Sequence, residues 1–239
     1  RLYQCMKEYN CDIVDCRMMR DYPNGRTYIY HKMPNRLDAE EKSIMEGGTH
    51  WIDRFGEEGY GGGVVTGLYK KELLLKSGVK FPEKILYEDN YWVAILMLYV
   101  KRYFHLAEDL YHYRQREDST VHKKNAMHHV DRLAIEEMKL KTYHDLHIYE
   151  RYREIIEQDF LREYYCRTLL TMLVKYDNSP YDVFCHMNRR VMELYPDYKK
   201  TELAQNEGIG KILLGLIDRD LDEVQFMEIK KIILSYYGR

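Results

Sequence analysis

Hydrophobic and polar positions follow two different patterns along the chain, and the change falls near Asn125. Before this point, two short stretches rich in β-branched and aromatic residues, CDIVDCRMM and RTYIYHKM, predict strands. RDYPNG lies between them, and its Asn24-Gly25 pair is typical of a hairpin turn. Further along, RYFHL and LYHYRQR predict two more strands.

Short helices are predicted between these strands. LDAEEKSIMEGG reads as a helix with Asp38 as its N-cap and Gly47 at its end, and LYKKELLLKSG as a helix that ends at Gly78. GYGGGVVTG contains neither of the common glycine-rich phosphate-binding patterns, so we expect a flexible loop there.

After Asn125 the chain carries apolar residues at helical spacing in almost every segment. In ERYREIIEQDFLREYYCRTLLTMLVKY these residues form one continuous stripe: Ile155, Phe160, Leu161, Tyr164, Leu169, Met172 and Leu173. The patterns together predict an α+β fold. Its α/β part covers residues 1–121, and an all-helical part covers residues 122–239.

Composition narrows the classes of function. The chain has 239 residues, 45% of them hydrophobic, which is enough for one large domain or two small ones. Lys and Arg (37) nearly balance Asp and Glu (39), so the strong positive charge of a nucleic-acid binder is missing and we expect no nucleic-acid partner. The five cysteines include no CxxC pair, and the longest apolar run is far short of the ~20 residues that span a bilayer. These features favour a cytoplasmic protein.

One acidic pair stands out by its position. Glu88 and Asp89 lie side by side just before an apolar run, and we expect them to open a helix that continues to about Tyr99. Near a helix N-terminus, unpaired backbone N–H groups favour an ionised carboxylate, which suits a proton acceptor. An ordinary N-cap gives the same pattern, and the spacing alone favours the cap.

Potential cations gather about twenty residues further on. In YHYRQRED, strand alternation places His112, Arg114 and Arg116 on one face, and Tyr111 and Tyr113 on the other. Guanidinium groups match the oxygens of a phosphate, so this face is a candidate diphosphate site. A solvated strand face is the alternative.

The order of these motifs resembles a known family. LYKKELLLKSGVKFPEKILYEDNYW followed by YHYRQREDSTVH is similar to the C-terminal half of the catalytic domain of family 2 glycosyltransferases, which are inverting, GT-A-fold enzymes. The resemblance covers roughly residues 2 to 125. It implies that Asp89 is the general base and that Glu88 is its acidic neighbour. The positions that match the region closing over the donor diphosphate are Arg114, Arg116, Ser119 and His122.

The resemblance also implies partners. The family's nucleotide-binding segment and D-x-D metal motif do not precede RLYQCMKEYN, so we expect this chain to be a fragment that begins inside the fold. A divalent ion, Mg or Mn, is implied for the full-length enzyme, with ligands outside this chain. The implied donor is a nucleotide sugar, and the implied acceptor is a carbohydrate or lipid-linked molecule used in polysaccharide biosynthesis at the cell envelope.

Other classes of function stay open. The helical half could be an interaction or scaffold module, in which case the acidic pair is a plain helix cap. Peripheral association with the inner face of the membrane is a third class, since lysines could form a basic rim, although a solvated helix face explains them as well. These lysines are Lys70, Lys71, Lys76, Lys80 and Lys84. If sheet neighbours are missing, the exposed edge could also form a homodimer.

Overall fold

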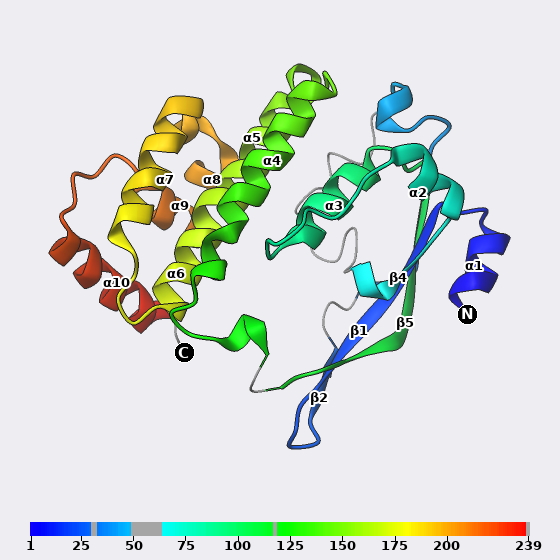
Figure 1. Ribbon diagram of the computed structural model, residues 1–239, viewed down its shortest axis with the longest axis horizontal. Coiled ribbons are helices and arrows are strands. Elements are labelled where there is room, and N and C mark those ends of the chain that lie inside the picture. Colours follow the sequence, from blue (N-terminus) through cyan, green and yellow to red (C-terminus); the bar gives the residue numbers. More distant parts are fainter. Residues whose placement is uncertain (30–32, 49–63, 117–118, 238–239) are drawn as a thin grey trace. The chain divides into compact units, whose positions relative to one another are not determined.

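The computed structural model describes residues 1–29, 33–48, 64–116 and 119–237. The chain divides into two compact units, whose elements are shown in Figure 1. The sheet unit comprises Arg1–Lys84 and Glu88–Ser119, and the helical unit comprises Ile85–Tyr87 and Thr120–Arg239. One unit contains a mixed sheet and helices, and the described part of the other unit is helical. This arrangement confirms the predicted α+β fold.

A mixed sheet forms the centre of the sheet unit. Its described strands are β1 (Ile13–Asp21), β2 (Thr27–Ile29), β3 (Arg36–Ala39), β4 (Gly67–Tyr69) and β5 (Arg102–Arg114). The order is β2-β1-β5-β3, and β4 pairs with the start of β1. β1 and β5, the two long strands in Figure 1, run parallel, and the other pairs are antiparallel.

The predicted hairpin is confirmed. β1 and β2 pair in antiparallel register, and Gly25 in the turn between them has φ = 77°. The Tyr22 N–H donates to the Arg26 carbonyl at 2.9 Å, which closes the turn. Residues 30–32 of the second predicted strand lie outside the described residues.

The prediction of two separate strands in RYFHL and LYHYRQR is wrong. β5 is one strand of 13 residues, because it stays paired with β1 on both sides of the polar residues Glu108 and Asp109. The extra residues are absorbed by shifts in register next to Arg17 of β1. Bulges of this kind let a strand continue through a local break in its alternation.

The prediction of a helix that begins at Asp38 is also wrong. Asp38 lies within β3, is buried, and forms an ion pair with Arg36 at 2.9 Å. Pairing with β5 outweighs the local capping signal here. A single 3₁₀ turn, Ile44–Glu46, forms instead behind a Ser43 capping box, and Gly47 ends it at φ = 91° as predicted.

Three α-helices belong to the described part of the sheet unit: α1 (Leu2–Glu8), α2 (Lys71–Ser77) and α3 (Glu88–Met97). α2 ends at Gly78, which has φ = 62°, as predicted. Part of the glycine-rich loop, residues 59–63, lies outside the described residues. Of the rest, Val64–Thr66 form a 3₁₀ turn that leads into β4.

The core of the sheet unit has two parts. One is a cluster between α1 and the sheet, made of Cys5, Met6, Cys11, Val14, Phe104 and Leu106. The other is the body of α3, which buries Trp92, Ala94, Ile95, Leu96 and Met97. Five of the last six residues of α3 are thus buried, so the helix is fixed in place by apolar packing.

The helical unit confirms the predicted helical second half. Its described α-helices are α4 (Asp131–Asp145), α5 (Arg153–Phe160), α6 (Thr168–Lys175), α7 (Tyr181–Leu194), α8 (Glu202–Gln205), α9 (Ile209–Leu214) and α10 (Glu223–Tyr237). A π-helix, Leu161–Arg167, joins α5 to α6 without a break. The predicted long helix therefore forms with a wider turn in its middle.

The apolar stripe of this long helix differs from the prediction at one position. Ile156 is buried at 3% exposure, whereas Ile155 is only partly buried. Ile156 stands four residues before Phe160 and so shares its face of the helix. In the part of the chain that the structure describes, no helix combines the length and the apolar content needed to span a membrane.

Candidate functional site

The acidic pair occupies the first turn of α3, as predicted. Asp89 is exposed, and its Oδ1 accepts a hydrogen bond from the Asn90 N–H at 2.9 Å. Glu88 is partly buried. α3 therefore presents one solvent-accessible carboxylate on a helix whose body is held in the core.

An aromatic group lies one turn further along α3. Trp92 is buried, and the exposed ring of Phe81 stacks on it with centroids 4.7 Å apart and an interplanar angle of 7°. Tyr69 meets the same indole edge-on at 5.2 Å. Positions i and i+3 share a helix face, so Trp92 and Asp89 lie on the same side of α3.

The end of β5 carries the expected cations. His112 and Arg114 are exposed, and Tyr111 and Tyr113 between them are partly buried, so the strand alternates as predicted. His112 is paired, because its Nδ1 lies 2.9 Å from Asp21 Oδ2. Arg114 and Arg116 have no ion-pair partner in the described ranges. Among the described residues, two guanidinium groups without an ion-pair partner therefore lie at the end of β5.

Ser119 and His122 complete the set that the resemblance indicates. Ser119 donates its backbone N–H to the Arg116 carbonyl at 3.2 Å, and residues 117 and 118 lie outside the described residues. His122 is exposed in the 3₁₀ turn Thr120–His122, which belongs to the helical unit. Across the described residues, no hydrogen bond or ion pair joins this set to Glu88 or Asp89.

The lysines of the expected basic rim are partly neutralised. Lys76 and Lys101 each lie 2.7 Å from a carboxylate oxygen of Glu46, and these two contacts lower the pKa of Glu46 to about 2. Lys70 bonds Asn10 and Asp12. A shallow cleft of about 400 Å³ lies here, lined by Asp12, Lys70, Glu72, Leu73, Lys76, Tyr99 and Lys101. The side chains that line this cleft therefore carry charges of both signs.

Two buried polar groups had no signal in the sequence. The first is the pair Asp15 and His105, at 2% and 3% exposure, with Asp15 Oδ1 2.8 Å from His105 Nδ1. Burial raises the pKa of Asp15, and the contact with His105 opposes that shift. The two residues are register partners in β1 and β5, which are separated by most of the sheet unit along the chain.

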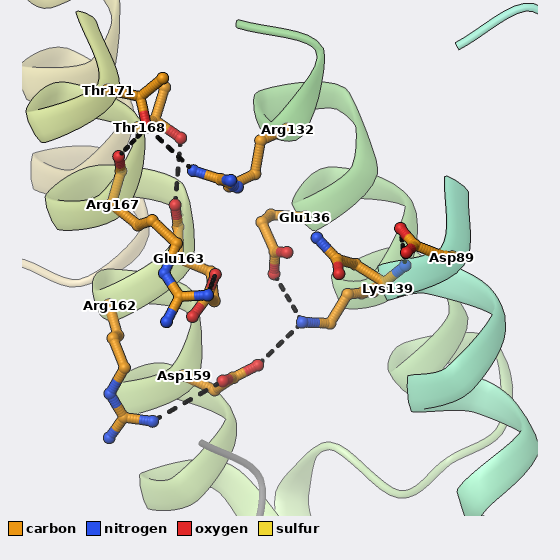
Figure 2. Close-up of polar contacts among 11 residues, drawn as sticks. Asp89, Arg132, Glu136, Lys139, Asp159, Arg162, Glu163, Arg167, Thr168 and Thr171 are labelled. Atoms are coloured by element: carbon orange, nitrogen blue, oxygen red, sulfur yellow. Dashed lines mark hydrogen bonds and ion pairs between the residues drawn. The ribbon is translucent and has the colours of Figure 1, made fainter. Parts of the chain in front are cut away.

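The second is a buried charged triad in the helical unit (Figure 2). Lys139 Nζ lies 2.7 Å from Glu136 Oε2 and 2.8 Å from Asp159 Oδ2. Burial raises the pKa of Glu136 to about 7, whereas Lys139 opposes this shift. Burial alone would lower the pKa of Lys139, but Asp159 and Glu136 raise it well above its usual value.

The triad joins helices and has no room for a ligand. Glu136 and Lys139 come from α4, and Asp159 comes from α5. The cavity beside them measures only about 10 Å³, less than one water molecule needs. The i, i+3 spacing of Glu136 and Lys139 is visible in the sequence, but it is also typical of a solvated helix face.

The ligands of the metal ion that the family resemblance implies are expected outside this chain. Within the described ranges, no group of three or more His, Cys, Asp or Glu side chains could hold a metal ion. The acidic pair of α3 offers two carboxylates from adjacent residues and no third ligand.

Comparisons with known proteins add no relative. No protein-family model matches the chain, and a search of characterised proteins found no match. The likeness to family 2 glycosyltransferases therefore rests on the motifs and their order.

Proposed function

We propose that this chain forms the acceptor side of an inverting glycosyltransferase, in which a sugar passes from a nucleotide sugar to an acceptor hydroxyl. The observation that carries the proposal is the exposed carboxylate of Asp89 in the first turn of a helix whose body is buried. The order of the motifs around it, LYKKELL, YED and YHYR, supports the same reaction class.

Asp89 is the general base in this mechanism. Its carboxylate accepts the proton of the acceptor hydroxyl while the hydroxyl oxygen attacks the anomeric carbon, and the nucleoside diphosphate leaves from the opposite face. Attack from the opposite face inverts the anomeric centre. General-base assistance of this kind is worth ~10²–10⁴-fold in rate. The hydrogen bond from Asn90 N–H occupies Oδ1, which leaves Oδ2 for the incoming hydroxyl.

The aromatic group beside Asp89 suits a sugar acceptor. Phe81 is 42% exposed and is supported from behind by its stack on Trp92. The exposed Phe81 ring offers a surface for the C–H face of a sugar, and Asp89, on the same side of α3 as Trp92, offers an acceptor for a sugar hydroxyl. Glu88, partly buried at the start of α3, orients the acceptor or its neighbours.

Arg114 and Arg116 supply positive charge for the departing diphosphate, because neither is neutralised by a carboxylate in the described part of the chain. Ser119 and His122 are further candidates for contact with the donor.

The test is a transfer assay on the protein. A panel of nucleotide sugars is offered with saccharide and lipid-linked acceptors, and release of nucleoside diphosphate is measured. We expect acceptor-dependent release and a product whose anomeric configuration, determined by NMR, is inverted. Retention of configuration would contradict the mechanism. No transfer together with no binding of any nucleotide sugar would favour the scaffold alternative.

A further inference from the structure

We propose that Asp131 and Arg132, at the start of α4, are positioning residues for the acidic pair of α3. They hold the segment Ile85–Tyr87, which ends at the peptide bond to Glu88, and thereby fix where α3 begins. This inference rests on the proposed function for its effect on catalysis, whereas the hold itself can be measured independently.

The first observation is how the chain is divided. Ile85–Tyr87 packs with the helical unit, although the residues on both sides of it, Lys84 and Glu88, belong to the sheet unit. A three-residue stretch is too short to pack by itself, so particular contacts within the helical unit must hold it.

A hydrogen bond provides one of these contacts. The Leu86 N–H donates to Asp131 Oδ2 at 3.0 Å. Asp131 is in the first turn of α4, and a hydrogen bond to a carboxylate acceptor is about twice as strong as one between neutral groups. The backbone immediately before the acidic pair is therefore tied to a helix terminus.

The adjacent residue provides the second contact. The Arg132 guanidinium lies over the Tyr87 ring, 4.4 Å from its centroid. Arg132 is only 7% exposed, and a cation–π contact strengthens when it is desolvated. Consecutive residues of α4 thus hold consecutive residues of the segment, one through the backbone and one through the side chain.

The backbone of the segment needs such support. Tyr87 in the segment has φ = 64°, and Lys84 just before the segment has φ = 59°, a conformation that residues other than glycine rarely adopt. It is retained only where surrounding contacts impose it. Since Tyr87 directly precedes Glu88, relaxation of its φ angle would change the direction in which the chain enters α3.

α4 is a firm support for these contacts. Further along α4 from Arg132, the buried triad links α4 to α5, as Figure 2 shows. Arg132 Nη1 also lies 3.5 Å from Thr171 Oγ1 of α6. α4 is therefore tied to two other helices of its own unit, to α6 near its start and to α5 near its middle.

The proposal is tested first at Asp131 in the full-length protein. Asp131→Ala removes the acceptor, so the Leu86 amide should exchange with solvent roughly tenfold faster or more. Asp131→Asn keeps an oxygen acceptor and should retain most of the protection. Asp182→Ala is the matched control, because Asp182 is an exposed acidic residue in the first turn of α7. It should leave exchange at Leu86 unchanged.

The effect on transfer is measured in the same variants. A misplaced base lowers turnover without weakening the binding of the donor, so Asp131→Ala should lower kcat by roughly 10–100-fold with little change in the KM for the nucleotide sugar. Asp131→Asn should restore most of kcat, and Asp182→Ala should keep all of it.

Substitutions of Tyr87 provide a second, independent test of the proposal. Tyr87→Phe keeps the ring beneath Arg132 and should behave as the wild type, whereas Tyr87→Ala should lower kcat and speed amide exchange in Ile85–Asp89. Urea unfolding identifies any variant whose global stability, rather than local order, has changed.

The outcomes separate this proposal from the proposed function. If the wild type transfers no sugar, the proposed function fails, and amide exchange alone decides whether Asp131 and Arg132 hold the segment. If the wild type is active but Asp131→Ala and Tyr87→Ala keep full kcat, the positioning role is overturned. Unchanged exchange at Leu86 in Asp131→Ala overturns the hold itself.

Discussion

Asp15 on β1 and His105 on β5 face each other in the parallel strand pair, with the Asp15 Oδ1 atom 2.8 Å from Nδ1 of His105. Both side chains are buried. A buried carboxylate is stable only when it is hydrogen-bonded or protonated, and burial raises the pKa of Asp15 accordingly. This pair links the two longest strands of the sheet.

We expect substitutions of His105 and Asp15 to lower the free energy of unfolding by different amounts. His105→Leu leaves the Asp15 carboxylate buried without its imidazole partner and should lower the free energy of unfolding by about 3 kcal/mol. Asp15→Asn keeps a polar partner for His105 and should cost less. Urea unfolding at pH 7 measures both. A neutral effect of His105→Leu would show that the pair does not stabilise the sheet.

The buried triad predicts a pH dependence of stability. The pKa of Glu136 is raised to about 7, above the ordinary value of 4.5. Between pH 4.5 and about 7, the folded state therefore keeps a proton that the unfolded state has already released. The stabilisation is complete below pH 4.5 and is lost as the pH rises through about 7. The slope is at most ~1.4 kcal/mol per pH unit.

Glu136→Gln removes this titration and keeps the shape of the side chain. Its free energy of unfolding, measured in urea between pH 5 and 8, should therefore fall less with rising pH than that of the wild type. Glu154→Gln, at an exposed site in the first turn of α5, is the control and should follow the wild type. Parallel curves for wild type and Glu136→Gln would contradict the prediction.

Asp89→Asn separates a catalytic base from a helix cap. Asn and Asp stabilise a helix N-terminus comparably, so the free energy of unfolding should fall by well under ~1 kcal/mol. An amide cannot take the proton of the acceptor, so turnover in the full-length protein should fall by at least ~10²-fold. Glu88→Gln should cost less, because Glu88 is proposed to orient. Intact transfer in Asp89→Asn, with a lower melting temperature in Asp89→Ala, would identify Asp89 as a cap alone.

The two arginines after Tyr113 should differ in effect. Arg116 lies beyond the end of β5, whereas Arg114 is its last residue. If the chain after the strand reaches the leaving diphosphate, Arg116→Ala should reduce turnover more than Arg114→Ala does. Arg26→Ala, at an exposed site in the β1–β2 turn, should have no effect. Equal, negligible losses in steady-state turnover would indicate a solvated strand face.

Local signals predicted a large part of the structure. The Asn24-Gly25 turn, the ends at Gly47 and Gly78, and the start of α3 at the acidic pair were all readable, because each depends on residues adjacent in sequence. Helical periodicity likewise predicted the second half, since a helix buries its apolar face at a fixed spacing.

The errors have a common cause. Asp38 carries a good N-cap signal but lies in β3, and the polar residues inside RYFHLAEDLYHYR predicted a break that β5 does not have. In both places, pairing with a strand distant in sequence provides hydrogen bonds that the local preference cannot offset.

The sequence by itself determined the α+β class, the helical half and the acidic pair at the start of a helix, because short-range periodicity and turn chemistry encode them. Only the tertiary structure decided that Asp15 meets His105, that Lys139 lies between Glu136 and Asp159, and that Asp131 holds Leu86. Each of these relations includes a contact between residues 20 or more positions apart, up to 90 for Asp15 and His105. Such contacts depend on strand register and helix packing, which are set by the burial of the whole core and leave no local pattern in the chain.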